Sequence, residues 1–440
     1  MTTPRHEDFI IEARWMIPIE PAGIVLENHA ILVQKGRIAD LLPTEASKAR
    51  YPGAPRVQLP HHVLMPGLIN THAHTAMSLL RGIADDLPLM RWLREAIWPR
   101  ESKHALTAFV YEGTLLGGAE MLRGGTTCVN DLYFYPDAGA RAYDELGLRA
   151  QVGMTVIDFP TPYASDVDDY FRKGLAARDA WADHSRIGFF FAPHAPYTVS
   201  DASLERIRDL AEQLDANIHI HLHETAGEVS DAIERNGIRP LARLQALGLL
   251  GPNLSVAHAV HMTEGELTAL AAAQVGVAHN PTSNMKLASG IAPIAQMITA
   301  GIHVGLGTDG AASNNRLDML QEMRHAALLA KVSTGDAAVL PAHQVLRMAT
   351  LDGAHAIGLQ DQVGSIEIGK IADLCAISVN NVFHQPYFDP ASHLIYVVGR
   401  EEVTDVWVDG IRRVQDGTLL HPHNKELMRI SGMWQNSLKA

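Results

Sequence analysis

The sequence is poor in cysteine, with only Cys128 and Cys375 among its 440 residues. Two cysteines cannot build a disulfide framework, and they exclude the paired Cys-x-x-Cys motifs that many structural zinc sites use. They also exclude a zinc site of the cytidine-deaminase type, which needs two or three cysteine ligands. Any metal in this protein must therefore be held by histidine and carboxylate side chains.

Basic residues and long apolar runs are also scarce. Lys and Arg number 36 against 49 Asp and Glu, and the formal net charge of −13 argues against nucleic acid as the main partner. No apolar run approaches the roughly 20 residues that cross a bilayer, and residues 1–8 lack the basic-then-apolar pattern of a signal peptide. We therefore expect a cytoplasmic protein that acts on a small molecule and has no membrane partner.

The middle of the chain alternates between two periodicities. From about residue 62, apolar runs bounded by turn signals are followed by stretches with helical spacing, such as 203–214 and 316–331. Eight such repeats predict an α/β fold, a parallel (β/α)8 TIM barrel. The predicted strands end at or near His72, Asp131, Asp158, His194, His221 to Glu224, His258, His279 and Asp309.

The two flanks lack this alternation and are rich in short β-type segments with turn signals. We expect residues 1–65 and 365–440 to form one small β-sandwich domain built from both termini. The barrel would then occupy residues 66–364.

The most informative motif is the pair His72 and His74, which follows the turn Pro66-Gly67 and an apolar run. Two imidazoles separated by one residue point to the same side of a strand, and this suits a single metal ion. The spacing alone is a weak signal in a chain with 23 histidines. Its position at the end of the first predicted barrel strand strengthens it, because barrel enzymes carry their chemistry at these ends.

Further ligands are expected at two other strand ends. Histidines alternate with aliphatic residues in 217–224, so we expect His219, His221 and His223 to share the inward face of one strand. His221 is expected at the depth of the metal, with His219 deeper and His223 at the rim. Asp309 offers a carboxylate, although Asp-Gly also favours a turn. The predicted open zinc site therefore consists of His72, His74, His221 and Asp309.

Two other residues are expected to manage protons at this site. A catalytic zinc lowers the pKa of water to about 7, and Glu224 is placed to shuttle a proton from that water to the substrate. His258 would orient the water or polarise the target, and His261, three residues later, is the competing candidate.

One metal per subunit is expected. A binuclear site usually needs a bridging ligand, commonly a carboxylated lysine at a strand end. Between the two histidine motifs the only lysines are Lys103 and Lys173, both in predicted helical stretches. The ligand set suits zinc, with iron and manganese as alternatives.

These motifs carry a family resemblance over nearly the whole chain. Segments 66–74 and 221–224, together with His258 and 307–309, resemble the amidohydrolase superfamily. More narrowly, segments 77–86, 192–197, 279–287 and 307–315 are similar to the 5'-methylthioadenosine/S-adenosylhomocysteine deaminases. The resemblance implies a zinc-dependent hydrolytic deaminase of adenine nucleosides, in which hydroxide adds to C6 of the ring and ammonia leaves.

The resemblance also implies particular roles. Glu224 would protonate a ring nitrogen, while His258 and Asp309 would handle the water and the proton of the leaving group. Substrate contacts would come from Glu101 at the ribose hydroxyls, from His194 at the purine and from Trp92 in the pocket wall.

One departure bears on the substrate. Family members that accept S-adenosylhomocysteine place arginines after the third barrel strand, whereas residues 150–171 contain neither Arg nor Lys. Met154, Pro160, Pro162 and Tyr163 stand there instead, and an apolar pocket suits a methylthio group. We therefore expect conversion of 5'-methylthioadenosine to 5'-methylthioinosine, with S-adenosylhomocysteine and adenosine as lesser substrates. Arg172 or a residue from a second subunit would be the exception.

Two alternatives stay open at the level of sequence. One is another amidohydrolase that acts on an aromatic ring, such as a guanine deaminase or a triazine-type chlorohydrolase. The other is a binding protein that keeps the barrel without catalysis, against which the complete ligand set and Glu224 argue. Barrels of this type often form homo-oligomers, but the sequence does not define an oligomeric state.

Overall fold

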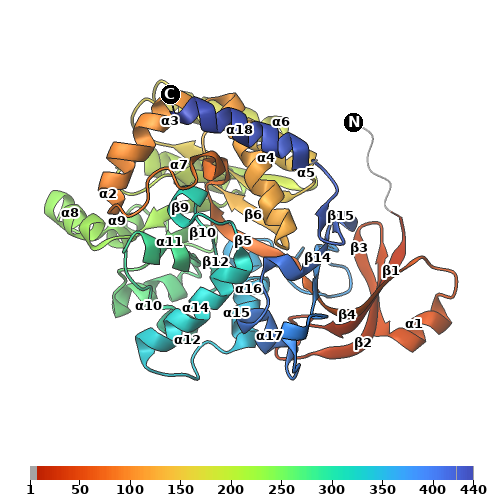
Figure 1. Ribbon diagram of the computed structural model, residues 1–440. Helices are drawn as coiled ribbons and strands as arrows, with labels where there is room; N and C mark the ends of the chain where they lie inside the picture. The colour runs from red at the N-terminus through yellow and green to blue at the C-terminus, as the bar shows by residue number, and fades with distance from the viewer. Residues whose placement is uncertain (1–6, 423, 440) are drawn as a thin grey trace.

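The computed structural model describes residues 7–422 and 424–439, which form a barrel with a separate sheet beside it (Figure 1). Parallel strands run around the barrel in chain order. The ring closes where the backbone N–H of Asp309 donates to the carbonyl of His72 at 2.9 Å. The strands are β5 (Leu68–Ala73), β6 (Thr126–Asp131), β7 (Arg149–Val156), β8 (Ile187–Pro193), β9 (Ile218–Leu222), β10 (Leu254–His258), β11 (Gly276–His279) and β12 (Val304–Leu306).

Each strand ends within three residues of its predicted end, which confirms the expected barrel. Helices cover its outer face (Figure 1). The helices that follow the barrel strands are α4 (Thr107–Arg123), α5 (Pro136–Leu146), α6 (Val167–Ala180), α7 (Asp201–Leu214), α8 (Ala226–Asn236), α9 (Pro240–Ala246), α10 (Glu264–Ala272), α11 (Pro281–Lys286), α12 (Ile294–Thr299), α13 (Ala311–Asn314), α14 (Met319–Thr334), α15 (Ala342–Met348) and α16 (Leu351–Ala356).

Helix α7 shows why the periodicity was informative. Ser200 caps its first turn by accepting the backbone N–H of Ser203, and Asp215 ends it in the left-handed region at φ 49°. Leu204, Ile207 and Ala211 fall on one face and are buried, as expected for residues spaced three and four apart. The helix therefore has one apolar side, which it packs against the barrel.

The expected β-domain built from both termini is also confirmed, and its strands are joined in one mixed sheet. Strand β4 pairs in parallel with β1 and antiparallel with β13, so it joins the N-terminal and C-terminal strands. In sheet order the strands are β16 (Thr418–Leu419), β15 (Ile411–Gln415), β14 (Val403–Val408), β13 (Leu374–Ser378), β4 (Arg56–Pro66), β1 (Phe9–Met16), β2 (Leu26–Gln34) and β3 (Arg37–Pro43).

The last helix, α18 (Asn424–Lys439), departs from the expected domain limits. It packs on α4 of the barrel, where the Trp434 ring meets Phe109 edge-on at 5.2 Å and its Nε1 donates to Glu112 at 2.5 Å. Leu427, Ile430 and Trp434 lie along one stripe of α18, and such a stripe needs an apolar partner. Residues 424–439 thus lie with the barrel rather than with the terminal sheet.

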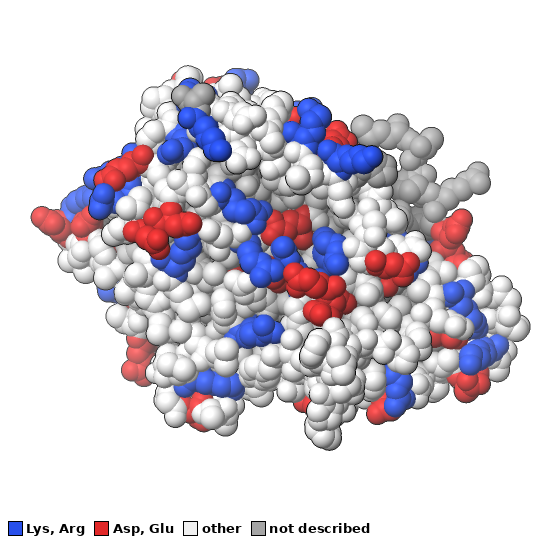
Figure 2. Space-filling model, in the orientation of Figure 1, with Lys and Arg blue, Asp and Glu red and all other residues white. Residues whose placement is uncertain are grey.

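The outer surface and the helices agree with the charge and hydropathy of the chain. On the face drawn in Figure 2, basic and acidic side chains are interspersed and no continuous basic area forms. Among the described helices, none is long and apolar enough to cross a membrane.

A buried ion pair fastens the terminal sheet to the barrel. Arg149 on β7 donates to Asp373 at 2.7 Å, and the two side chains are only 3% and 1% exposed. We expect Arg149→Met to lower the free energy of unfolding by about 3 to 5 kcal/mol, because it leaves the Asp373 carboxylate buried without its cation. Urea unfolding measures this loss. The double variant with Asp373→Leu should recover most of it, and no recovery would contradict the explanation.

Candidate active site

A cavity of about 270 Å³ opens at the C-terminal ends of the barrel strands. Most of the residues predicted from the sequence line it, although they come from points spread over more than 230 positions of the chain. His72 lies beneath the cavity and is fully buried. The predicted residues in its wall are His74, Trp92, Glu101, His194, His221, Glu224, His258 and Asp309.

The four predicted metal ligands converge on one point. His74 Nε2 lies 3.2 Å from both His221 Nε2 and Asp309 Oδ1, and His72 Nε2 lies 3.4 Å from Asp309 Oδ1. Donor atoms at 2.0 to 2.2 Å from a tetrahedral zinc lie about 3.3 to 3.6 Å apart, so these separations suit a shared ion. His72 Nε2 is buried and has no hydrogen-bond partner among the described atoms. The donor set therefore fits a single zinc.

Hydrogen bonds on the far side of two imidazoles orient them. His74 Nδ1 lies 2.6 Å from the carbonyl of Leu132, and His221 Nδ1 lies 2.5 Å from the carbonyl of His194. A carbonyl only accepts, so both Nδ1 atoms carry the proton and both Nε2 lone pairs face the centre.

The third imidazole is held by a short relay below the cavity. His72 Nδ1 lies 2.9 Å from His219 Nε2, and His219 Nδ1 lies 2.7 Å from the hydroxyl of Ser255. His219 thus sits deeper than His221, as predicted, and supports His72 from below. Ser255 was not predicted, because its link to the site passes through two other side chains.

The two carboxylate oxygens of Asp309 have different surroundings: one accepts hydrogen bonds from the protein, and the other faces the predicted metal ligands. The hydroxyls of Ser283 and Ser313 donate to Oδ2 at 2.6 and 2.8 Å, which leaves Oδ1 facing His72 and His74. Both serines lie in segments that carried the family resemblance, although no role was predicted for them.

Burial also keeps the imidazoles of His72 and His221 neutral. It lowers the pKa of His72 to about 4, and it lowers the pKa of His221 well below its usual range. A metal binds the neutral form of imidazole. The site is therefore ready to bind a cation at neutral pH without first releasing protons from these rings.

The structure corrects the prediction for His223. Strand β9 ends at Leu222, and His223 adopts a left-handed conformation at φ 52°. The alternation of faces stops there, so His223 turns away from the cavity and accepts the backbone N–H of Leu241 at 3.2 Å. Glu224 enters the cavity in its place, and burial raises the pKa of its carboxyl group.

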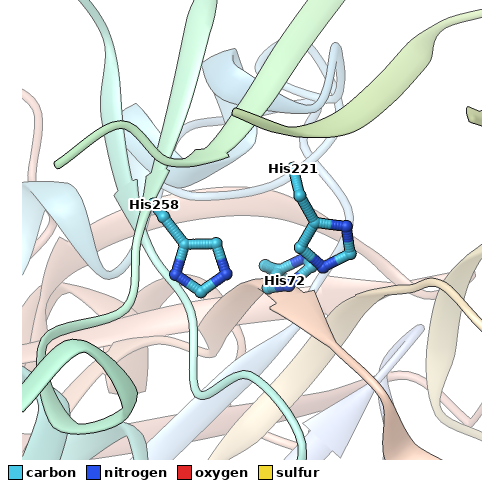
Figure 3. A group of neighbouring side chains, drawn as sticks. All are labelled: His72, His221 and His258. Atoms are coloured by element: carbon cyan, nitrogen blue, oxygen red, sulfur yellow. The ribbon is translucent and has the colours of Figure 1, made fainter. Parts of the chain in front are cut away.

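His258, rather than His261, faces this carboxylate. His258 Nε2 lies 4.0 Å from Glu224 Oε2, and its Nδ1 lies 2.8 Å from Asn284 Oδ1. His261 Nε2 instead donates to the carbonyl of Ser289 at 2.7 Å and does not line the cavity. Figure 3 shows the ring of His258 beside those of His72 and His221, which come from different strands.

The outer part of the cavity carries the predicted substrate contacts. Trp92 and Glu101 lie on a helical segment composed of α2 (Leu89–Arg91), η2 (Trp92–Ile97) and α3 (Trp98–His104). The hydroxyl of Tyr133 donates to Glu101 at 2.6 Å, and burial raises the pKa of that carboxyl group. Tyr133 was missed, since nothing in its local sequence shows that it meets Glu101. His194 also lines the wall; its ring centroid lies 5.0 Å from that of His221, and its Nδ1 is hydrogen-bonded to the hydroxyl of Thr198 at 3.0 Å.

A (β/α)8 barrel with three imidazoles, one carboxylate and an adjoining acid at its C-terminal face defines a metal-dependent hydrolase. Comparison with known proteins agrees, because the Amidohydrolase family matches residues 63–412. The chain belongs to this family, and within it to the 5-methylthioadenosine/S-adenosylhomocysteine deaminases, as the resemblance implied. A relative with that name from Teredinibacter turnerae is 45% identical over 100% of both chains.

Solved structures share the fold of this chain. The crystal structure of an adenosine deaminase from Xanthomonas campestris with bound zinc has a TM-score of 0.97 and 47% identity, covering 99% of this chain and 100% of that chain. Atrazine chlorohydrolase TrzN from Arthrobacter aurescens has a TM-score of 0.91 but only 23% identity, covering 97% of this chain and 99% of that chain. At this low identity the chlorohydrolase shares the fold and supports nothing further.

Proposed function

We propose that this protein is a zinc-dependent hydrolytic deaminase of adenine nucleosides, with 5'-methylthioadenosine as its preferred substrate. The observation that carries the proposal is the convergence of His72, His74, His221 and Asp309 beside the carboxylate of Glu224. The names of the relatives, and the zinc in the Xanthomonas campestris structure, support the same activity.

The chain's own residues divide the chemistry. Zinc, when bound, supplies a nucleophilic hydroxide at neutral pH, since it lowers the pKa of water to about 7. Glu224 takes the proton from the attacking water and delivers it to a ring nitrogen, a role that suits a carboxyl group whose pKa is raised by burial. His258 carries a proton on Nδ1 toward Asn284 and presents Nε2 to the cavity. Together with Asp309 it guides the water and the proton that leaves with ammonia.

Glu101 is positioned to hold the ribose. Its carboxylate receives one hydrogen bond from Tyr133 and keeps further acceptor capacity for a pair of sugar hydroxyls. His194 would contact the purine between Glu101 and the ligands, and Trp92 would form an apolar wall. These contacts would direct the ring toward the histidine cluster.

The cavity wall supports the preference for the methylthio compound. None of the described residues that line it is Lys or Arg, while Phe159, Pro160 and Pro162 form part of its rim. Arg172, the predicted exception, bonds to Asp169 and is 70% exposed away from the cavity. A free amino-acid carboxylate on the substrate would therefore find no Lys or Arg among the described residues that line the cavity.

We expect kcat/KM for 5'-methylthioadenosine to exceed that for S-adenosylhomocysteine by at least about tenfold, which corresponds to roughly 1.4 kcal/mol. Ammonia release from each thioether measures the ratio. Phe159→Arg should lower this ratio of kcat/KM values, because it supplies a cation at the rim of the cavity for the carboxylate of S-adenosylhomocysteine. Lys103→Arg adds a guanidinium at a residue that does not line the cavity and serves as the control. Equal or better use of S-adenosylhomocysteine by the unaltered protein would contradict the preference.

The two alternative activities, guanine deamination and triazine dechlorination, would use the same site of the barrel. An ammonia-release screen over adenine nucleosides, guanine and cytosine distinguishes a nucleoside deaminase from a guanine deaminase. Chloride release from a chlorinated triazine tests the chlorohydrolase. Cytoplasmic residence and association into a homo-oligomer remain predictions.

A further inference from the structure

The direction in which the Glu224 side chain points depends on a strained backbone turn at His223. His223, directly before it, has a left-handed φ of 52°, and a non-glycine residue in this region persists only when its surroundings hold it. If the chain stayed extended, His223 would point inward with His221, and Glu224 would point away from the cavity. Whatever holds this turn therefore decides whether the proton-transferring carboxylate reaches the substrate.

Glu228 holds the turn with both of its carboxylate oxygens. The backbone N–H of His223 donates to Oε1 at 2.9 Å, and that of Glu224 donates to Oε2 at 2.8 Å. On the opposite side, the carbonyl of His223 accepts the N–H groups of Val260 and His261, each at 3.1 Å. The turn is thus fastened to α8 through Glu228 and to the segment after β10 through its carbonyl.

Glu228 differs in this respect from the corresponding glutamate of a second helix in the same chain. Helices α8 and α10 both begin with Thr-x-x-Glu, as Thr225-x-x-Glu228 and Thr263-x-x-Glu266. In α10, Glu266 returns to the N–H of its own cap residue Thr263 at 2.8 Å, which is the ordinary capping box. Glu228 instead bonds to the two residues before its cap, and those residues carry the active-site turn.

We propose that Glu228 is a positioning residue for deamination, which acts by holding the turn that aims Glu224 into the cavity. The inference rests on the proposed deaminase function. Glu228 does not line the cavity, so it acts through Glu224 and does not touch the substrate.

The test begins with Glu228→Gln in the zinc-loaded protein, with 5'-methylthioadenosine as substrate. Glutamine keeps one acceptor oxygen but sets an NH2 group against the second backbone N–H. A displacement of Glu224 by about 1 Å is expected to lower kcat by roughly tenfold to a hundredfold. KM should change by less than about threefold, since the groups that bind the nucleoside are untouched, and zinc content should stay at one per chain. Glu234→Gln, the same change at an exposed position of α8, should keep the wild-type kcat.

A double variant separates positioning from a general loss of structure. If Glu228 acts through Glu224, then E224Q/E228Q should be no less active than E224Q alone. A further loss comparable to that of E228Q alone would overturn the inference, as would loss of zinc from E228Q or a wild-type kcat in E228Q. A wild-type protein that releases no ammonia from any adenine nucleoside would overturn the proposed function and this inference with it. An active wild type with an equally active E228Q would overturn the inference alone.

Discussion

Replacing Glu224 with glutamine is expected to lower kcat for 5'-methylthioadenosine by about 10³-fold while zinc remains bound. The carboxylate lies in the cavity beside His258 and outside the ligand set, so its loss removes proton transfer and leaves the metal site intact. Positioned general acids and bases contribute roughly 10²- to 10⁴-fold to rate. Steady-state ammonia release together with zinc analysis of the same sample measures both quantities.

The stability of this variant provides a second readout. Burial raises the pKa of Glu224, which means that the folded protein disfavours its charged form. At neutral pH the charged carboxylate therefore costs stability, and neutral glutamine should leave the midpoint of thermal unfolding equal or higher. Glu205→Gln, an exposed change on α7, is the matched control for both measurements. Turnover by E224Q within tenfold of wild type would remove Glu224 from the proton path.

The second large effect is expected at Asp309. Asp309→Asn keeps an oxygen for the hydroxyls of Ser283 and Ser313 but removes the negative charge that faces His72 and His74. Zinc affinity should fall by at least about a hundredfold, since changes to groups that merely support a ligand already cost 10- to 100-fold. Activity should fall with the zinc content, and excess zinc should restore part of it.

Competition with a chromophoric chelator measures this affinity directly. Asp361→Asn, at an exposed position, controls for the loss of one carboxylate. An Asp309→Asn protein that binds zinc as tightly as wild type would show that the fourth ligand lies elsewhere.

The ligands could be predicted because local patterns determine them. Apolar runs fix where the barrel strands lie, a barrel brings all strand ends to one face, and His72, His74, His221 and Asp309 stand at those ends. The substrate residue Glu101 came only from family resemblance, because its helical segment has no pattern that points to the cavity.

The remaining features depend on contacts between distant parts of the chain. His223 was misplaced because its left-handed turn is held by Glu228 and by backbone groups after β10, and strand alternation carries no sign of either. Tyr133 and Ser255 join the site through other side chains. The apolar stripe on α18 can be read from the sequence. The sequence does not show that the stripe packs on the barrel, because that packing depends on the contacts of Trp434 with α4.

We infer that three histidines and Asp309 hold one zinc and that an adenine nucleoside is deaminated in this cavity. The most direct test is ammonia release from 5'-methylthioadenosine by the purified protein, measured at zinc loadings from zero to above one per chain. Activity is expected to rise in proportion to zinc, to reach its plateau at one zinc per chain, and to yield one ammonia for each 5'-methylthioinosine formed. A protein fully loaded with zinc that releases no ammonia, or whose activity plateaus only at two zinc ions per chain, would contradict it.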